Sequence, residues 1–542
     1  MKAGGRSRNF WWKGYSVFDS EFERNLFELR KSKLAEIEKL GQAAYPNQFP
    51  ASHTIPEIRA KWGEATAEVL DGERTVVSIA GRIMAIRVMG KAGFATLQQG
   101  GERLQIYVRL DAVGEQGWAL YKLLDLGDHV GASGYLFRTK TGELSVHVEK
   151  LTFLAKAMLA LPEKYHGLAD VELRYRQRYV DLFANLDARE VFVKRAKVLR
   201  ALRRFFDERG YLEVETPMMQ TIPGGAAARP FRTHHNALDM DLYLRIAPEL
   251  YLKRLVVGGL DRVYEINRNF RNEGVSTQHN PEFTMLEFYQ AYANYEDMIQ
   301  LTIDLLKFVA LEVNGTTISE FNGVQLDFGK VEKLTMREAI VKWWPEETAG
   351  TRPGNEDLTV PEAGAESPSL RSLVDRLRSS GKQVAYEPGE PSGKTIANIF
   401  ETVAERYLQQ PTIIYEFPTA ISPLSKQKPN DPDWVERFEV YAGGFELGNA
   451  FSELNDPVEQ QKRFEDQLKE RARGDDEAHQ MDEDYVRALA YGLPPTGGEG
   501  IGIDRLVMLL TGSKSIRDVI LFPLMRSTGT EGSSEQENKE AH

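Results

Sequence analysis

The sequence predicts an α/β (α+β) protein in which an N-terminal β-barrel precedes a larger domain built on an antiparallel sheet flanked by helices. Short β-prone runs divided by glycines fill residues 76–153, whereas strand and helix signals alternate from about residue 187 onward. The chain has 542 residues, of which 42% are hydrophobic and 27% charged, an ordinary globular balance. This length and composition predict at least two domains, each with its own core.

The composition excludes several classes of protein. The sequence contains no cysteine, which rules out disulfide scaffolds, thiolate zinc sites, iron-sulfur clusters and cysteine nucleophiles. The net charge of -12 argues against a chain-wide binder of nucleic acid, although it allows local basic surfaces. The sequence has neither the apolar core of a signal peptide nor a stretch of roughly 18 uncharged apolar residues. We therefore expect a cytoplasmic protein that does not enter a membrane.

The first part of the chain is typical of a helix followed by a small barrel. Residues 21–40 carry apolar side chains, among them Phe22 and Leu29, near helical spacing, and Gly41 ends the pattern. Five β-prone runs follow, with one helical stretch (EQGWALYKLLDLGD) between the third and the fourth. This order matches an OB-fold barrel, which commonly binds single-stranded nucleic acid. We assign residues 21–160 to this domain and leave residues 1–20 as an extension of unassigned role.

A helix from about Asp187 to Arg209, with Phe192, Ala196, Leu199 and Phe206 on one face, leads into the second domain, residues 161–526. An inserted region at about 330–400 includes a loop rich in Pro, Gly and acidic residues at 346–368. Residues 527–542 are predicted to form a disordered tail. The segment GEPSGKT (389–395) is one residue short of a phosphate loop, so its amides cannot encircle a phosphate in the usual way.

Residues 263–290 predict a long hairpin, because two alternating runs flank a polar loop. Alternation places Phe283, Met285, Glu287 and Tyr289 on one face, and Glu265, Asn267, Asn269 and Arg271 on the same face of the partner strand. Carboxylates, an arginine and a phenol interleaved with Phe and Met favour a cleft over the alternative, a solvated face.

Two further segments also combine charged side chains with apolar residues. Residues 438–454 place Leu447, Asn449, Phe451 and Glu453 on one face after a Gly-Gly interruption, with Glu439 and Glu446 on either side of it. Paired carboxylates on stiff strands suit Mg²⁺ bound to phosphates, and surface glutamates on an edge strand are the alternative. Residues 498–510 run glycines into Asp504, a candidate N-cap, and Arg505, which would open a helix and hold a phosphate. A purely structural turn is the alternative here.

Three strings, FDERGYLEVETPMM, FRNEG followed by HNPEF, and GIGIDR, resemble in this order the signature motifs of class II aminoacyl-tRNA synthetases. In detail, the sequence is similar to the bacterial-type lysyl-tRNA synthetases over roughly residues 21–526. The similar segments include RYRQRYVDL, PGGAAARPF, APELYLKRLVVGG, NAFSELNDP and RDVILFP. The resemblance implies a class II catalytic domain after the OB-fold domain. It also implies a homodimer with motif one, including Pro217, at its interface.

The resemblance assigns roles to individual residues. Arg271 would bridge the lysine carboxylate and the α-phosphate of ATP, and Arg505 would hold the γ-phosphate, which makes these two the candidate catalytic residues. Phe283 would stack on adenine, and Mg²⁺ would bind Glu439 and Glu446. The implied ATP site comprises Arg271, Glu273, His279, Asn280, Phe283, Glu439 and Arg505. The implied lysine site comprises Gly225, Glu249, Arg271, Glu287, Tyr289, Asn449, Phe451 and Glu453.

Physical chemistry independently supports L-lysine as the substrate. The string APELY carries Glu249 where the aspartate and asparagine enzymes of the same subclass have a neutral amide. A buried cluster of carboxylates attracts an ammonium and repels aspartate. The alternative interpretation of Glu249 is a helix-start residue after Pro248, favoured by the helix dipole.

In the barrel, the resemblance implies that Phe94 stacks on a base and that Arg87, Gln105 and Glu143 contact base edges of a U-rich anticodon. The alternative for Phe94 is a core position. Two positions depart from the family pattern: Glu499 stands where many relatives have an aliphatic residue, and Gly93 where many have Ser.

The implied function is that of a lysine-tRNA ligase. Such an enzyme activates L-lysine with ATP to lysyl-adenylate and pyrophosphate, and transfers lysine to the 3′ end of tRNA(Lys). One alternative is a non-catalytic relative that binds RNA or regulates, which the intact Arg271, Arg505, Glu439 and Glu446 oppose. The other is a relative that lysylates a protein, which the presence of the barrel opposes.

Overall fold

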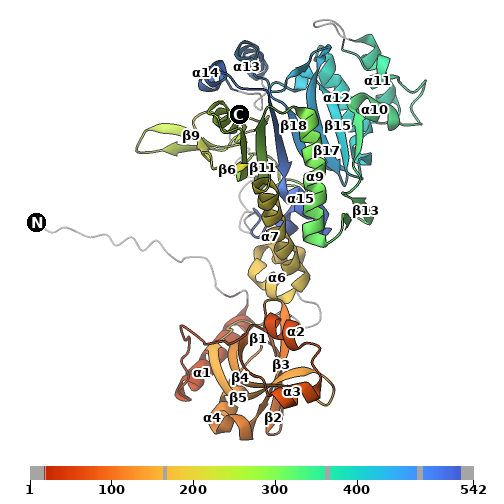
Figure 1. Ribbon diagram of the computed structural model, residues 1–542. Helices are drawn as coiled ribbons and strands as arrows, with labels where there is room; N and C mark the ends of the chain where they lie inside the picture. Colours follow the sequence, from red (N-terminus) through yellow and green to blue (C-terminus); the bar gives the residue numbers. More distant parts are fainter. Residues whose placement is uncertain (1–17, 19, 163–167, 361–366, 473–479, 527–542) are drawn as a thin grey trace, which may run out of the picture. The chain divides into compact units, whose positions relative to one another are not determined.

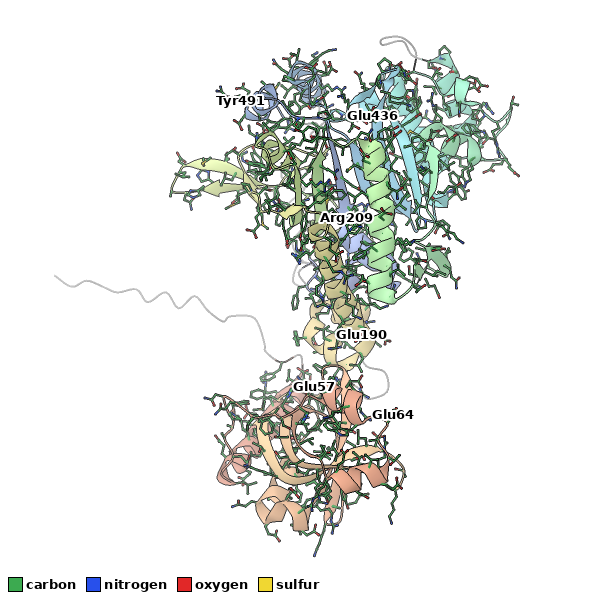
Figure 2. The ribbon with its side chains drawn as sticks, in the orientation of Figure 1. Glu57, Glu64, Glu190, Arg209, Glu436 and Tyr491 are labelled. Carbon is green, nitrogen blue, oxygen red and sulfur yellow. The ribbon has the colours of Figure 1, made fainter. Side chains whose placement is uncertain are left out.

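The computed structural model describes residue 18 and residues 20–162, 168–360, 367–472 and 480–526 (Figure 1). Most of the N-terminal extension and the whole tail predicted at 527–542 lie outside the described residues. The chain divides into two compact units, residues 1–189 and 190–542. The boundary falls inside helix α7 (Leu186–Asp207). Glu190 lies within this helix, and Arg209 follows its C-terminal end (Figure 2).

The first unit contains a closed five-stranded barrel with the strand order β1-β2-β3-β5-β4. Three strands, one helix and two strands follow one another along the chain, which confirms the predicted OB fold. Alternate residues of each strand, such as Ile79, Leu97 and Ile106, are fully buried in the barrel core. The elements are β1 (Val76–Met89), β2 (Ala92–Gln99), β3 (Glu102–Arg109), α4 (Leu110–Leu123), β4 (His129–Arg138) and β5 (Leu144–Ala155), preceded by α2 (Ile55–Trp62) and α3 (Ala67–Glu73).

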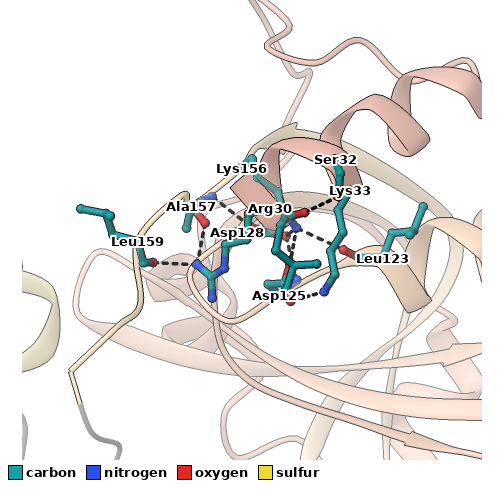
Figure 3. Close-up of polar contacts among 10 residues, drawn as sticks. Arg30, Ser32, Lys33, Leu123, Asp125, Asp128, Lys156, Ala157 and Leu159 are labelled. Atoms are coloured by element: carbon teal, nitrogen blue, oxygen red, sulfur yellow. Dashed lines mark hydrogen bonds and ion pairs between the residues drawn. The ribbon is translucent and has the colours of Figure 1, made fainter. Parts of the chain in front are cut away.

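Helix α1 (Glu21–Lys39) confirms the predicted N-terminal helix and has Ser20 as its N-cap. The prediction of a buried apolar face on this helix is wrong in part. Phe22 is 70% and Leu29 55% exposed, whereas Ile37 is fully buried. Polar contacts attach much of the helix instead: Arg30 Nη1 donates to the carbonyl oxygen of Ala157 at 2.6 Å (Figure 3).

A buried ammonium completes the network beneath α1. The Lys156 side chain is 0% exposed and its Nζ lies 2.7 Å from Asp125 and 2.8 Å from Asp128 (Figure 3). Lys33 of α1 approaches the same Asp125 at 2.6 Å. Because each buried charge has a hydrogen-bonded partner, the network is compatible with a buried location.

The second unit is built on a nine-stranded sheet with the main order β14-β15-β17-β18-β19-β11-β10-β6, and β16 also pairs with β17. Neighbouring strands are antiparallel except for the parallel pairs β14 with β15 and β10 with β6. The strands are β6 (Leu212–Glu213), β10 (Arg262–Phe270), β11 (Glu282–Ala291), β14 (Glu332–Thr335), β15 (Thr412–Pro418), β16 (Gln427–Lys428), β17 (Asp431–Ala442), β18 (Phe445–Ser452) and β19 (Thr496–Gly502).

One face of this sheet is covered by α7, α9 (Tyr295–Asn314) and α15 (Ile503–Thr511), which form the main core with it (Figure 1). Val198, Leu202 and Phe205 of α7 are fully buried there, whereas the predicted face residue Ala196 is exposed. The opposite face carries two smaller hydrophobic clusters, which cover part of it.

Smaller elements surround the sheet. The inserted region between β14 and β15 contains α10 (Met336–Lys342), α11 (Pro368–Ser379) and α12 (Ser392–Val403), which share a core of their own. Glu390 accepts a hydrogen bond from Thr395 Oγ1 at 2.8 Å, so a carboxylate lies at the start of α12, where a phosphate loop would hold an anion.

The remaining elements are β7 (Met219–Gln220), β8 (Arg232–His235), β9 (Met240–Leu244), β12 (Ile318–Phe321), β13 (Val324–Asp327), α5 (Val171–Arg176), α6 (Arg178–Ala184), α8 (Glu249–Val257), α13 (Pro457–Ala472), α14 (Glu483–Ala490), α16 (Ile516–Val519) and three short 3₁₀ turns at 355–357, 405–407 and 419–421. No helix in the described ranges combines the length and the apolarity that a membrane crossing requires.

Candidate active site

A cavity of about 420 Å³ opens on the face of the sheet opposite α7 and α9, over strands β11, β17, β18 and β19. Every residue predicted to bind ATP, lysine or metal lines this cavity, with the exception of Glu453. Glu453 is buried directly behind the wall, since its Oε1 would lie 2.3 Å from a Cβ placed on the lining residue Gly498.

Strand β11 of the β10–β11 hairpin lines the cavity, whereas no residue of β10 itself does. Glu265 pairs with Glu287, Asn267 with Met285, and Asn269 with Phe283, so their side chains share one face. The intervening residues Tyr264, Leu286 and Phe288 belong to the main core on the other face. The alternation in the sequence therefore identified the shared face correctly, but only its β11 residues line the cavity, while Glu265, Asn267 and Asn269 are buried beside it.

A β-bulge changes the pattern on β18. Val440 of β17 pairs with Gly448, but Tyr441 pairs with Glu446, which leaves Leu447 without a partner residue on β17. The extra residue turns Glu446 to the same face as Asn449. The prediction that the Leu447 side chain shares this face is wrong, because Leu447 is buried in the main core.

The third motif is held by Asp504, which was expected to be an N-cap. The N-cap of α15 is Gly502, and Asp504 is already helical. Its carboxylate accepts the Thr284 backbone N–H of β11 at 2.7 Å and pairs with Arg195 at 2.6 Å. Asp504 therefore ties α15 to two other elements and fixes the direction of the next residue, Arg505.

Arg505 is oriented by contacts that leave its charge facing the cavity. Its Nη1 donates to the carbonyl oxygen of Glu446 at 2.6 Å, and its Nη2 lies 3.2 Å from His279 Nε2. Because a guanidinium only donates, His279 Nε2 accepts and Nδ1 carries the proton toward Ser276 Oγ, 2.9 Å away. Burial and the charge of Arg505 lower the pKa of His279, which agrees with this neutral tautomer.

Arg271 directly follows β10, and its partly buried side chain lines the cavity. Its guanidinium is 5.1 Å from the centre of the Phe283 ring, and its Nε has no hydrogen-bond partner among the described residues. Burial lowers the pKa of Arg271, but an arginine stays charged at neutral pH. A buried charged donor without a partner is the arrangement expected where an anionic ligand binds.

The opposite end of the cavity is acidic. Burial raises the pKa of Glu287 to about 8, and the neighbouring Glu249 adds to this increase. Tyr289 Oη donates to Glu287 Oε2 at 3.4 Å. Burial also raises the pKa of Glu249 and of Glu453, and the charge of Lys253 opposes that increase. Several buried carboxylates with one resident ammonium make this end selective for a further cation.

Sequence reasoning missed two basic residues of the site. Lys253 lies one helical turn after Glu249, a spacing that is visible in ELYLK and that predicts an ion pair. Arg437 of β17 donates to Glu439 Oε1 at 2.5 Å and to Asn449 Oδ1 at 3.0 Å. It thereby links a candidate metal ligand to a candidate lysine ligand. Its place two residues before Glu439 on one strand was the available signal.

Two carboxylates, Glu439 and Glu446, face the cavity near Arg505. Burial, together with the neighbouring carboxylate of Glu446, raises the pKa of Glu439 to about 7. Within the described part of the chain, no group of three or more His, Asp or Glu side chains could hold a metal by itself. The pair fits an ion that is also bound by phosphate oxygens, which is the usual mode of Mg²⁺.

On the barrel, the candidate nucleic-acid residues lie on the outer face. Arg87 pairs with Phe94, and Phe94 with Tyr107, whose ring stacks on Phe94 at 4.6 Å between centroids. Phe94 is partly exposed and does not belong to the barrel core, so the alternative of a core position is wrong. Gln105 accepts from Ser145 Oγ at 2.9 Å.

Glu143, at the start of β5, pairs with Arg59 at 3.0 Å. The sequence analysis missed the aromatic row that continues from Tyr107 to His147 and Tyr135. The alternation of RLQIYVRL could have identified its first member. A Cβ on Gly93 would lie 2.4 Å from the Tyr121 ring, so a serine would have no room at this position of the barrel.

Comparison with known proteins agrees with this geometry. Residues 170–526 match the family of class II tRNA synthetases (D, K and N), and residues 77–154 match the OB-fold nucleic acid binding domain. The chain belongs to the class II tRNA synthetases of this group, as the three motifs predicted.

Individual relatives show which enzymes of this group the chain is similar to. The chain is 52% identical over 508 residues to the lysine-tRNA ligase of Moorella thermoacetica, covering 93% of this chain and 99% of the relative. It is 51% identical to the lysine-tRNA ligase of Syntrophomonas wolfei (94% and 100% covered) and 52% identical to the heat-inducible lysine-tRNA ligase of Escherichia coli K12 (92% and 95% covered).

Proposed function

We propose that this protein is an ATP-dependent lysine-tRNA ligase. The observation that carries the proposal is one cavity that is lined both by the cationic side chains of Arg271 and Arg505 and by the buried carboxylates Glu249 and Glu287. An amino acid that bears both a carboxylate and a side-chain ammonium fits between these two sets of side chains. The names of the relatives, which match over nearly their full length, support the same substrate.

In the first step, an oxygen of the lysine carboxylate attacks the α-phosphorus of ATP, and the bond to pyrophosphate breaks. Arg271 would hold the α-phosphate and the carboxylate together, and Arg505 the γ-phosphate, so both stabilise charge that develops on the phosphates. Mg²⁺, held by Glu439 and Glu446, would neutralise the triphosphate. Phe283 would stack on the adenine, while Glu273, His279 and Asn280 complete the ATP site.

Recognition of lysine would use the acidic end of the cavity. Glu249, Glu287 and Glu453 would accept the ε-ammonium, and Tyr289 orients Glu287 through its hydroxyl. Gly225, Asn449 and Phe451 would shape the remainder of the pocket. In the second step, a hydroxyl at the 3′ end of tRNA(Lys) attacks the lysyl carbonyl carbon and AMP leaves.

The barrel would recognise the anticodon of tRNA(Lys) through Phe94, Arg87, Gln105 and Glu143. The stacked, partly exposed pair of Phe94 and Tyr107 supports this role, because aromatic faces on an OB fold stack on unpaired bases. Since ATP and tRNA are intracellular, we expect the enzyme to act in the cytoplasm.

Lysine-dependent exchange of pyrophosphate into ATP tests the activity directly. We expect exchange with lysine and none with aspartate or asparagine. Absence of lysine-dependent exchange by the purified protein would refute the proposal.

We also propose a homodimer. Pro217 is surrounded in sequence by the exposed apolar side chains of Leu212 (52%), Met218 (47%) and Met219 (56%), beside the edge strand β6. Such a patch marks an interaction surface, and most soluble oligomers are symmetric dimers. Met219→Glu should shift the sedimentation of the protein from dimer toward monomer, whereas Leu311→Glu, at an exposed position of α9, should not. A monomeric wild type would refute the dimer.

A further inference from the structure

A fixed ammonium lies behind the acidic end of the cavity. The side chain of Lys253 on α8 is 0% exposed, its Nζ is 2.5 Å from Glu249 Oε1, and it also pairs with Glu453 Oε2. The rings of Phe451 and Tyr485 lie 5.3 and 5.9 Å from the same nitrogen. Lys253 does not line the cavity, whereas Glu249 does.

Each carboxylate has one oxygen paired with Lys253, which leaves the other for a ligand. Glu453 Oε1 has no hydrogen-bond partner among the described residues and points at the cavity wall where Gly498 lacks a side chain. A buried acceptor of this kind requires a donor from a bound molecule.

Charge balance explains why a resident ammonium is needed. A buried carboxylate stays ionised only beside a cation, and Glu249, Glu287 and Glu453 share this end of the cavity with Lys253. Without Lys253 the empty site would take up further protons, and a protonated carboxyl is a poor acceptor for an ammonium.

We propose that Lys253 is a positioning residue for lysine recognition: its ammonium offsets part of the cost of burying negative charge on Glu249 and Glu453 and holds one oxygen of each, so that the other oxygen meets the ε-ammonium of the substrate. This inference rests on the proposed function, because it concerns the lysine end of the same site. Lys253 itself does not touch the substrate. The other titratable or charged groups that face this cluster are Glu287 and Tyr289 on β11, Tyr485 on α14 and Arg437 on β17.

The test compares wild-type protein with Lys253→Met in lysine-dependent exchange between pH 6.5 and 8.5. We expect Lys253→Met to raise KM for lysine about tenfold or more at neutral pH while KM for ATP stays unchanged, because only the lysine end loses ionised acceptors. In the wild type, KM for lysine should fall as the pH rises. In the variant this fall should move to higher pH, since Glu249 and Glu453 then lose the cation that opposes their protonation.

A matched control exists in the first unit. Lys156 is likewise an enclosed ammonium paired with two carboxylates, and Lys156→Met should lower the melting temperature without altering KM for lysine or its pH profile. Lys253→Arg keeps the charge and should keep the wild-type pH profile. If Lys253→Met does not fold, Lys253→Gln provides the same loss of charge in a side chain that still donates hydrogen bonds.

The outcomes separate the two claims. Wild-type KM and pH profile in Lys253→Met or Lys253→Gln would overturn the inference, and so would a lower melting temperature with an unshifted profile, which would mean that Lys253 only holds α8 in place. Absence of lysine-dependent exchange in the wild type would instead refute the proposed function itself.

Discussion

Arg271 is a charged side chain whose buried Nε has no hydrogen-bond acceptor among the described residues. Transition-state charge on the α-phosphate would lose its nearest cation in Arg271→Ala. We expect lysine-dependent exchange to fall about 10²-fold or more, with the dimer and the melting temperature retained. Arg268→Ala on the same strand is the control, since Arg268 is exposed and its pair with Glu282 spans 3.5 Å. Near-normal exchange in Arg271→Ala would show that motif two has been misassigned.

Glu499 is a buried carboxyl whose surroundings favour the protonated form. The Thr302 hydroxyl lies 2.7 Å from the carbonyl oxygen of Met298 and 2.5 Å from Glu499 Oε2. One hydroxyl has one proton, so if Thr302 donates to Met298, Glu499 must donate to Thr302. Burial raises the pKa of Glu499 to about 8, in agreement with this count, and no cation pairs with it in the described ranges.

This carboxyl should make the stability of the second unit depend on pH. Its pKa is higher in the folded state than the ordinary 4.5, so its contribution is fully present below pH 4.5 and is lost as the pH rises to about 8. The loss is about 1.4 kcal/mol for each pH unit within that window. Glu499→Gln keeps a donor to Thr302 and removes the titration. Its melting temperature relative to wild type should rise between pH 6 and 8 and then level off. A difference that is constant with pH would contradict the buried-acid interpretation.

At the level of elements, β18 shows where sequence reasoning fails. Strict alternation identified the shared face of the β10–β11 hairpin, because the two strands pair regularly from Arg262 and Gln290 to Phe270 and Glu282. The same rule misplaced Leu447, because the bulge depends on the pairing with β17, which no single strand encodes. The prediction of the buried face of α1 was wrong in part for a related reason. Polar contacts from Arg30 and Lys33 help to hold this helix against the barrel, and Phe22 is exposed.

Strand β19 needs a glycine at the lysine end of the cavity. A Cβ on Gly498 would lie 2.3 Å from Glu453 Oε1 and 2.4 Å from the Tyr289 ring, both of which are buried and unable to withdraw easily. Gly498→Ala should therefore raise KM for lysine about tenfold or more while KM for ATP changes little, because bound lysine needs the displaced groups.

Gly500 is the matched control two residues along the same face. A Cβ there would meet the flexible end of Met285 at 3.0 Å, so Gly500→Ala should be the milder change. Equal KM values for lysine in the two variants would contradict the assignment of the Gly498 wall to the lysine site.

At the scale of the whole molecule, the two units have separate cores, and this separation was visible in the sequence as a change from short strand signals to mixed helix and strand signals. The functional residues of the larger unit come from segments as distant as Gly225 and Arg505, and only the sheet order brings them into one cavity. Motif resemblance could supply that grouping, whereas Lys253 and Arg437 had only weak signals in the sequence and were identified through their contacts. Recognition of tRNA and the adenylation chemistry are therefore expected to be separable by mutation.

Phe94→Ala should reveal this separation. Loss of a base-aromatic stack is worth about 1 to 3 kcal/mol, or roughly 5- to 150-fold in tRNA affinity, so aminoacylation of tRNA should weaken while lysine-dependent exchange stays nearly unchanged. Because Phe94 lies on the outer face of the barrel, its removal should cost little stability. Phe153→Ala is the control for packing: Phe153 is 1% exposed in the barrel core, and its loss should cost about 3 to 5 kcal/mol of stability. Measuring both reactions and thermal unfolding on the two variants distinguishes recognition from packing, and unchanged tRNA charging in Phe94→Ala would exclude Phe94 from anticodon binding.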